Sequence, residues 1–383
     1  MKKLLLVLSF TMFPVLAHGT TYYVAKTGSN SNSCASAQSQ TTPKLTINAG
    51  VGCLGAGDTL IVRASTYRER FGDAVPSGTT IQSEVKRGAI IAPGTDTAFN
   101  IGSSSAKTNI TLDGLVLDGE NTVSSYLIHI RGNSSSITVQ NMEFKNIKGN
   151  GTNNNGGGLM TSFLSTAPNI IIRGNSFHDI GNNDAAGMCT ACYPYGIYQS
   201  SAGILIEHNE FYKISGFAIH GYSSAGNINN NIYRYNTFRD TGPVLITYHG
   251  TGNQFYNNTL WRVGTSAITG NHDAIQSLGA ALIANNTIVE TTGGGSCMLI
   301  SQPKNTIRNN ICWQGNTTIN QQATPNTVDH NLLGQNPLFV NEATGDFHLQ
   351  NGSLALDAGV GMPGLSFNGS APDLGAFEAG VSA

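Results

Sequence analysis

The feature that most limits the fold is a short segment that recurs nine times, at intervals of 21 to 34 residues. Each copy alternates apolar and polar residues and places one bulky apolar residue on either side of a central position. The first apolar column contains Leu112, Val139, Ile172, Ile206, Tyr233, Phe255, Ile283, Ile307 and Val328. The second contains Leu117, Phe144, Phe177, Phe211, Phe238, Leu260, Ile288, Cys312 and Leu333. The central column contains Leu115, Met142, Asn175, Asn209, Asn236, Asn258, Asn286, Asn310 and Asn331.

This repeat predicts an all-β fold, a single-stranded right-handed parallel β-helix. A period of two is typical of strands with one buried face. The interval is too short for a strand–helix–strand unit of about 30 residues or more. It suits one coil of three short strands, and coils stacked about 4.8 Å apart bury the apolar columns in one core. Leucine-rich repeats need a Leu-x-x-Leu-x-Leu frame, and propellers need four strands per roughly 40 residues, so neither fits.

The asparagine column has a structural interpretation. Each amide can bond a neighbouring backbone group and the asparagine in the next coil. Asparagine also tolerates the left-handed backbone conformation that a sharp turn needs. We therefore expect these side chains to stack at a turn rather than to take part in catalysis.

The N-terminus has the pattern of a secretory signal. Lys2 and Lys3 precede an apolar run over residues 4–13, and small residues follow at 15–17. This pattern predicts a signal peptide at 1–17, with a secreted or periplasmic mature domain at 18–383. A buried N-terminal helix is the alternative. The run is too short to span a bilayer, which needs roughly 20 residues, and no later segment is apolar enough to do so.

The charge composition argues against some classes of binding partner. Only 11% of the residues are charged, 46 are glycine, and the formal net charge is −2. Loss of the two signal lysines makes the mature chain about −4. Without a basic stripe, nucleic acid is not an expected partner. We expect a monomer.

Six cysteines in an exported chain predict disulfides. Cys189 and Cys192 form a CxxC pair, which in other contexts indicates redox chemistry or half of a zinc site. No second CxxC exists and no helix is expected after it, so a local loop staple is favoured. The other expected pairs are Cys34 with Cys53 and Cys297 with Cys312, although sequence does not fix the connectivity.

Both ends of the chain resemble a known superfamily. The opening stretches 21–28 and 57–67 look like those of many bacterial proteins in the pectate-lyase-like β-helix superfamily. The end, from 336–339 through 356–359 to 372–378, resembles the closing segment common in that group, and we expect closure over about 335–380. The resemblance implies a β-helix fold. It leaves the activity open, because lyases, hydrolases, epimerases and adhesins share the fold.

A second strand in each coil suggests where a site lies. The apolar residue of that strand should point inward and its successor outward. The outward column would then contain His129, Met160, Tyr198, His220, Thr247 and Thr269. Two residues further along, a second column would contain Arg131, Ser162, Ser200, Tyr222, His249 and Asn271.

These columns bring polar aromatic residues together in the middle coils. We predict a working face with the catalytic candidates Tyr198, His220, Tyr222 and His249. The substrate-binding candidates are Arg131, Asn271, His272 and Asp273. The longest insertions, 146–158 and 178–194, lie in the coils directly before the cluster, and long loops on a solenoid wall the binding face. The alternative is that a parallel sheet simply exposes such residues.

The residue types favour chemistry on an acidic sugar. Uronate lyases and epimerases need a base, a proton donor and a group that neutralises the carboxylate. Tyr198 or His220 would be the base and the other the donor. The carboxylate partner would be Arg131, Arg234, Arg239 or a Ca²⁺ ion. Hydrolysis needs paired carboxylates, whereas the central coils carry few outward acids and no adjacent Asp-Asp or Asn-Thr-Asp pattern.

Two functional classes remain open from the sequence. The first is an enzyme that acts on an acidic polysaccharide by β-elimination or C5 epimerisation. The second is a non-catalytic extracellular or adhesin-like protein that binds glycans through an aromatic face. A bare stalk comes third, because a stalk would not need the long central loops.

Overall fold

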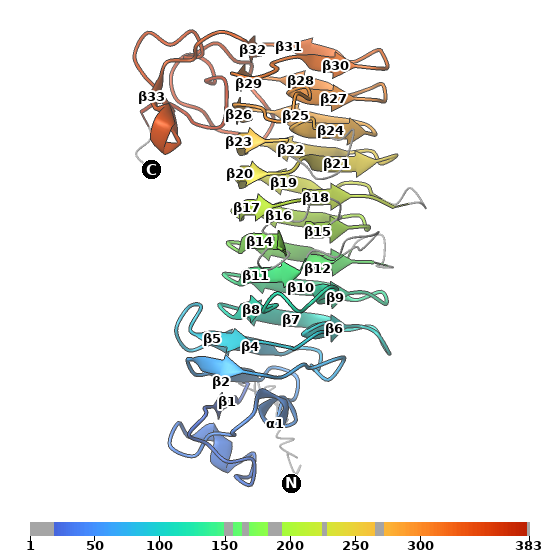
Figure 1. The fold of residues 1–383 in the computed structure, drawn as a ribbon, viewed down its shortest axis with the longest axis vertical. Coiled ribbons are helices and arrows are strands. Elements are labelled where there is room, and N and C mark those ends of the chain that lie inside the picture. The colour runs from blue at the N-terminus through green and yellow to red at the C-terminus, as the bar shows by residue number, and fades with distance from the viewer. Residues whose placement is uncertain are drawn as a thin grey trace, which may run out of the picture.

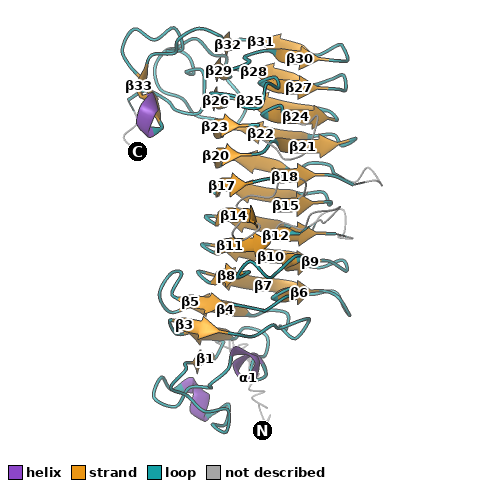
Figure 2. Ribbon diagram, in the orientation of Figure 1, coloured by secondary structure: helices purple, strands orange, loops and turns teal. Residues whose placement is uncertain are grey.

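The computed structural model describes residues 19–148, 156–162, 168–182, 194–223, 228–264 and 272–380. Within them, the chain winds through three parallel sheets, called here sheets A, B and C, and from β4 onward it visits them in that order. The coils stack from the N-terminus to the C-terminus along one axis (Figure 1). Among the described residues, helix occurs only as short pieces near the two ends of the solenoid (Figure 2). The predicted fold class, a parallel β-helix, is confirmed.

Sheet A contains β1 (Thr21–Val24), β2 (Thr59–Val62), β4 (Thr80–Ser83), β7 (Thr108–Asp113), β10 (Ser135–Gln140), β13 (Ile170–Arg173), β16 (Ile204–Glu207), β19 (Ile232–Arg234), β22 (Asn253–Tyr256), β25 (Ala281–Ala284), β28 (Thr306–Arg308) and β31 (Thr327–Asp329). Sheet B contains β3 (Ser65–Tyr67), β5 (Ala89–Ile91), β8 (Val116–Asp118), β11 (Glu143–Lys148), β14 (Ser176–Asn182), β17 (Glu210–Ile214), β20 (Thr237–Thr241), β23 (Thr259–Val263), β26 (Thr287–Val289), β29 (Ile311–Trp313) and β32 (Leu332–Leu333). Sheet C contains β6 (Phe99–Ile101), β9 (Tyr126–Ile130), β12 (Gly157–Thr161), β15 (Tyr195–Gln199), β18 (Phe217–Gly221), β21 (Val244–Tyr248), β24 (Ile275–Leu278), β27 (Met298–Ile300) and β30 (Ile319–Gln321).

The two predicted apolar columns form the core as far as Ile307 and Cys312. Their last members, Val328 and Leu333, are 37% and 36% exposed, so the prediction is wrong for this coil, whose strands are the last of sheets A and B. Ile172 pairs with Ile206 in sheet A, and Phe177 pairs with Phe211 in sheet B. Phe211 is fully buried and lies between two parallel rings, with centroid distances of 4.9 Å to both Phe177 and Phe238. This stacking repeats at about the strand spacing through Phe144, Phe177, Phe211 and Phe238, so in these four coils one aromatic ring per coil packs on the next.

The asparagine column is a continuous ladder at the turn between sheets A and B. Nδ2 of Asn209 donates to Oδ1 of Asn236 at 3.0 Å and to the Ile172 carbonyl at 2.9 Å. The Asn209 Oδ1 in turn accepts from the backbone N–H and the Nδ2 of Asn175. Both donors and both lone pairs of the amide are therefore used inside the core, where an unmade bond would be costly.

One detail of the ladder prediction is wrong. The ladder asparagines do not adopt the left-handed conformation; the residue just before each of them does. At this position φ is positive for Gly114, Asn141, Gly174, His208, Tyr235, Asn257, Asn285, Asn309 and His330. The backbone turns one residue early, and this leaves each ladder side chain pointing into the stack.

The N-terminal end of the solenoid is covered by a short helix, α1 (Ile47–Val51), preceded by a 3₁₀ turn at Ser36–Gln38. Ile47 and Val51 are buried against the first coil, and Figure 1 shows α1 below β1 and β2. The predicted disulfide between Cys34 and Cys53 is confirmed and ties this segment to the helix.

The C-terminal segment folds back along the side of the last coils (Figure 1). It contains the antiparallel hairpin of β33 (Phe339–Asn341) and β34 (Asp346–Leu349), joined by a 3₁₀ turn at Glu342–Thr344. Phe339 and Phe347 form a second apolar cluster with Val289 and Ile311 on the outer side of sheet B.

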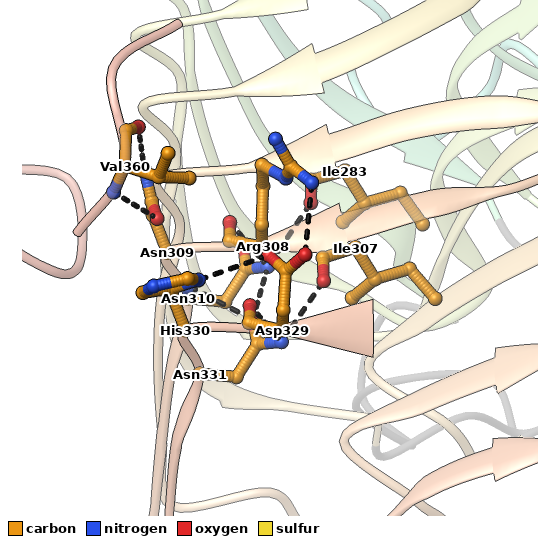
Figure 3. A network of polar contacts seen from close by, with 9 residues as sticks. All are labelled: Ile283, Ile307, Arg308, Asn309, Asn310, Asp329, His330, Asn331 and Val360. Atoms are coloured by element: carbon orange, nitrogen blue, oxygen red, sulfur yellow. Dashed lines mark hydrogen bonds and ion pairs between the residues drawn. The ribbon is translucent and has the colours of Figure 1, made fainter. Parts of the chain in front are cut away.

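A two-way clamp fixes the same segment at the turn between sheets A and B. Asn309 donates from Nδ2 to the Val360 carbonyl at 2.8 Å and accepts from the Val360 N–H at 3.0 Å (Figure 3). The predicted disulfide between Cys297 and Cys312 is also confirmed, and both cysteines are buried in the core of these last coils. Cys189 and Cys192, like the proposed signal peptide, lie outside the described residues.

The stacked core makes a direct prediction about stability. Phe211→Ala should lower the free energy of unfolding by about 3–5 kcal/mol, because it removes a buried ring and leaves a cavity between two others. Chemical denaturation of the mature protein measures this. Phe367→Ala is the control, because that ring is 43% exposed and should cost little. Equal stability of the two variants would contradict the assigned core.

Candidate functional site

The outer face of sheet C carries the predicted column through its first four coils. His129 pairs with Met160, Met160 with Tyr198, and Tyr198 with His220. The next members are Leu245 and Gln276, which replace the predicted Thr247 and Thr269. Thr269 lies outside the described residues.

The placement of Thr247 on the outer face is wrong. Its side chain is fully buried, and its Oγ1 donates to the Ile228 carbonyl and accepts from the Gly250 N–H. The register shifts between Leu245 and Thr247, so the period-two alternation breaks within β21. A bulge of this kind moves every later side chain to the opposite face.

Three of the four catalytic candidates lie in direct ring contact. The rings of Tyr198 and His220 have centroids 5.1 Å apart, and those of His220 and Tyr222 are stacked at 5.5 Å. Tyr222 continues to Tyr248 at 4.6 Å, and Tyr248 to the exposed His249 at 4.1 Å. His249 therefore joins the row only through Tyr248, which the sequence analysis missed because of the register shift.

An aromatic wall that sequence reasoning also missed lies beside this row. The centroids of Tyr195 and Phe217 are 4.8 and 4.7 Å from that of His220. Tyr126 contacts Tyr198 edge-on at 6.2 Å. Each of these residues is the first of its strand and lies three positions before a member of the predicted column. A tyrosine or phenylalanine recurring at the start of the strand was the sequence signal that could have identified this wall. The outer face of sheet C is thus an aromatic surface with hydroxyl and imidazole groups.

Burial sets the protonation states of the central pair. Desolvation lowers the pKa of His220 to about 3, so the imidazole is neutral near pH 7. Its Nδ1 is buried and has no hydrogen-bond partner among the described residues. Burial, followed by the charge of Tyr222, raises the pKa of Tyr198, so its hydroxyl keeps its proton. The pair therefore offers one unprotonated nitrogen and one protonated oxygen.

His129 and Arg131 lie at the N-terminal side of the same face. Nε2 of His129 is 2.7 Å from the Ser162 Oγ, and burial, followed by the charge of Arg131, lowers the pKa of His129 to about 4. The Nε of Arg131 is buried and, within the described part of the chain, unpaired. Arg131 is three strand spacings, or about 14 Å, from Tyr222 along the column. Arg131 can therefore bind a carboxylate on this face, but not the carboxylate of a sugar that lies at His220.

The remaining substrate-binding candidates lie two coils beyond His220. Asp273 accepts from the Ser296 N–H at 2.8 Å and from Nε2 of Gln276 at 3.4 Å. His272 approaches the Gly264 carbonyl through Nδ1 at 3.4 Å. Because Gln276 is in the outward column, Asp273 borders the same face, with Leu245 between it and His220. Asn271 is outside the described residues.

The other proposed carboxylate partners are on different sheets. Arg234 in sheet A pairs with Glu207 at 2.7 Å. Arg239 in sheet B pairs with Glu210 at 3.1 Å. The four strands of sheet C around the site, β12, β15, β18 and β21, contain neither Lys nor Arg. Across the described ranges, no three or more His, Cys, Asp or Glu side chains are grouped to hold a metal ion.

The densest ionic network lies on sheet B and has a different character. His178 is 2.7 Å from Asp179 and 3.3 Å from Glu143, one carboxylate at each ring nitrogen. Although burial opposes it, hydrogen bonds to these two carboxylates raise the pKa of His178, and the pKa of Glu143 falls to about 2. An imidazole held between two anions has no free lone pair to accept a proton, so this network is unsuited to act as a base.

Comparisons with known proteins agree with the architecture. No protein-family model and no curated protein matches the chain. Among solved structures, pectate lyase Pel9A is similar with a TM-score of 0.58 and 16% identity, over 95% of this chain and 97% of that one. An alginate lyase from Paenibacillus sp. str. FPU-7 is similar with a TM-score of 0.50 and 14% identity, over 74% and 95%. Identities this low establish shared architecture, and the chain therefore has the fold of the pectate-lyase-like right-handed parallel β-helices.

Proposed function

We propose that this protein is a carbohydrate-active β-helix protein that acts on an acidic polysaccharide at the outer face of sheet C. The observation that carries the proposal is the contact between Tyr198 and His220, 5.1 Å between ring centroids, within a continuous aromatic surface. Aromatic rings with polar tips bury the faces of a ligand and still form hydrogen bonds. Two of the similar solved structures are a pectate lyase and an alginate lyase, which supports a glycan substrate.

The proposed reaction is β-elimination or C5 epimerisation of a uronate residue. His220, as the neutral base, takes the proton from the carbon next to the carboxylate. In elimination, the bond from the ring to the leaving oxygen then breaks and Tyr198 protonates that oxygen. In epimerisation, Tyr198 returns a proton to the same carbon from the other side. A bound carboxylate near His220 raises its pKa toward neutrality and makes it a better base.

The flanking residues are proposed as subsites for neighbouring sugars. Arg131 would bind a carboxylate at one end of the face, and His272 with Asp273 would contact the chain at the other. Tyr222 and His249 would line the central stretch. Asn271, outside the described residues, is kept as a candidate for substrate binding. A Ca²⁺ ion is the remaining candidate for neutralising the carboxylate at His220.

A protein that acts on polysaccharides is expected to work outside the cytoplasm. Two disulfides among the described residues agree with an environment outside the cytoplasm. In that part of the chain, no helix is long and apolar enough to span a membrane. We propose that a signal peptide at 1–17 directs export of a monomeric domain at 18–383, and N-terminal sequencing of the secreted protein tests the cleavage site.

Removal of the imidazole should abolish the reaction and leave the fold intact. His220→Ala should lower kcat at least about 100-fold, as loss of a general acid or base typically does. The measurement is the rise in ultraviolet absorbance from the unsaturated product on alginate and on polygalacturonate, and proton exchange at C5 detects epimerisation. His330→Ala, in an exposed histidine at the last coil, is the control. Full turnover by His220→Ala would rule out His220 as the base.

The pKa of His220 also predicts how stability depends on pH. A histidine in the unfolded chain has a pKa of about 6.5, whereas folded His220 titrates near 3. As pH falls, the unfolded chain therefore takes up the proton first. The free energy of unfolding should be unaffected by this group above about pH 6.5 and should decrease as pH falls toward 3.

Melting midpoints measured between pH 7 and pH 4 check this prediction, and the decline should be shallower for His220→Gln than for the parent protein. An identical slope for His220→Gln and the parent would show that His220 titrates normally in the folded protein.

A second candidate function is glycan binding without catalysis. The absence of Lys and Arg from β12, β15, β18 and β21 favours it, because nothing in these strands neutralises a uronate carboxylate. Two substitutions of Tyr198 separate the candidates. For an enzyme, Tyr198→Phe should reduce turnover about 100-fold and keep affinity, because only the proton donor is lost. For a binding protein, Tyr198→Phe should bind glycan normally, Tyr198→Ala should bind weakly, and no variant should produce product.

A further inference from the structure

The turn between sheets A and B carries an unusual side chain. The residue before each ladder asparagine has the left-handed backbone conformation. Glycine, asparagine and histidine tolerate this conformation, whereas a bulky residue adopts it rarely. Tyr235 occupies this position with a φ of 55°. The turn itself does not require an aromatic residue, because Asn257 and Asn285 form the same turn in the next two coils. A strained residue that the fold does not need points to a role at the surface.

Tyr235 and its neighbour form an aromatic ridge on this turn. The rings of His208 and Tyr235 are stacked with centroids 5.0 Å apart and an interplanar angle of 13°. Tyr235 is 39% exposed, so it lies outside the core. The guanidinium of Arg234 approaches its ring at 5.7 Å. We call the two stacked rings the His208–Tyr235 ridge.

A hollow of 290 Å³ lies beside the ridge. Gly174, the turn residue one coil earlier, lines the hollow together with Arg87 and His208. Hydrogen bonds from the Arg87 guanidinium to the Asn141 and Met142 carbonyls fix its position. Glu210, whose carboxylate pairs with Arg239 at 3.1 Å, also lines the hollow. The space approaches the lower end of small-ligand sites, which begin at about 300 Å³.

The ridge also leads to a second cavity. Tyr235 contacts Tyr256 edge-on with centroids 6.3 Å apart. Tyr256 lines a groove of 580 Å³ on the outer side of sheet A, between Gln254 and the C-terminal loop at 362–365. Lys304 stands at the same groove. Hollow, ridge and groove form one track, with a cationic side chain at each end.

We propose that this track is a second polysaccharide-binding site, separate from the face of sheet C, and that it holds a uronate-containing chain. The sugar rings would lie against His208 and Tyr235, and the carboxylates would meet Arg87 and Lys304. An extended polymer fits better than a single sugar, because the ridge lies between the two cavities, with Tyr235 lining one and its neighbour Tyr256 lining the other. Binding here would keep the protein on its polymer while sheet C engages another stretch.

The geometry of this turn allows the ridge to be removed without disturbing the fold. Tyr235→Asn and His208→Asn install the residue that other coils use at the same left-handed position, so melting midpoints should equal or exceed that of the parent. His330→Asn is the matched control, because His330 occupies the same turn position at the last coil with a φ of 51° (Figure 3). Electrophoretic retardation in gels containing alginate, polygalacturonate or neutral hydroxyethylcellulose measures binding. All variants carry His220→Ala, so that the polymer is not consumed.

We expect retardation by at least one uronate polymer, with affinity reduced about three- to tenfold in Tyr235→Asn, as loss of one aromatic contact implies. His330→Asn should bind normally. Retention of full affinity by both Tyr235→Asn and His208→Asn would overturn the proposal, as would an equal loss in His330→Asn or no retardation in either uronate gel. Stronger retardation by hydroxyethylcellulose would overturn the carboxylate recognition. The readout is binding alone, so an inactive sheet C leaves the outcome interpretable.

Discussion

The rest of the structure depends on the amide ladder between sheets A and B. Each ladder asparagine bonds the coil before it and the coil after it, as Asn236 does with Ile206 and Asn258. If one coil shifted by a single residue relative to the next, these buried amide groups would lose their hydrogen-bond partners. Each unpaired group would lower the stability of the fold by about 1–3 kcal/mol. The ladder therefore fixes the register of sheets A and B, and with it the stacking of Phe177, Phe211 and Phe238 behind the turn.

That constraint explains why so much of the fold could be predicted. Two apolar columns and the asparagines between them are local patterns, and they recover the pairing of sheets A and B residue by residue. A second, shorter ladder at the entry to sheet A, where Asn231 donates to Asn253 at 3.0 Å, was visible in the same alignment but not identified. The exact turn residue was mistaken because asparagine occurs on both sides of the bend, as at Asn257 and Asn258.

Sheet C could be predicted only in part. The predicted outward column is correct as far as His220, because β15 and β18 pair without a register shift. It failed at β21, where the chain enters sheet C two residues earlier than the apolar pattern suggests and then bulges. Sequence periodicity carries no signal for such a shift. Thr247 was consequently assigned to the surface and Tyr248 was overlooked. The ring contacts of Tyr198 with His220 and of His220 with Tyr222 were predicted because they lie in coils before the bulge.

The folded-back C-terminal segment affects the order in which the molecule can assemble. Neighbouring coils need only 21 to 34 residues of chain to complete their contacts, so they can form successively from the N-terminal end. The last coils differ, because Trp261 and Trp313 pack against residues of the hairpin and its continuation. Ala376 reaches back 89 residues to bond Thr287. A chain emerging N-terminus first thus leaves an apolar strip on its final coils until its last 40 or so residues arrive, and that interval is when it is most exposed to aggregation.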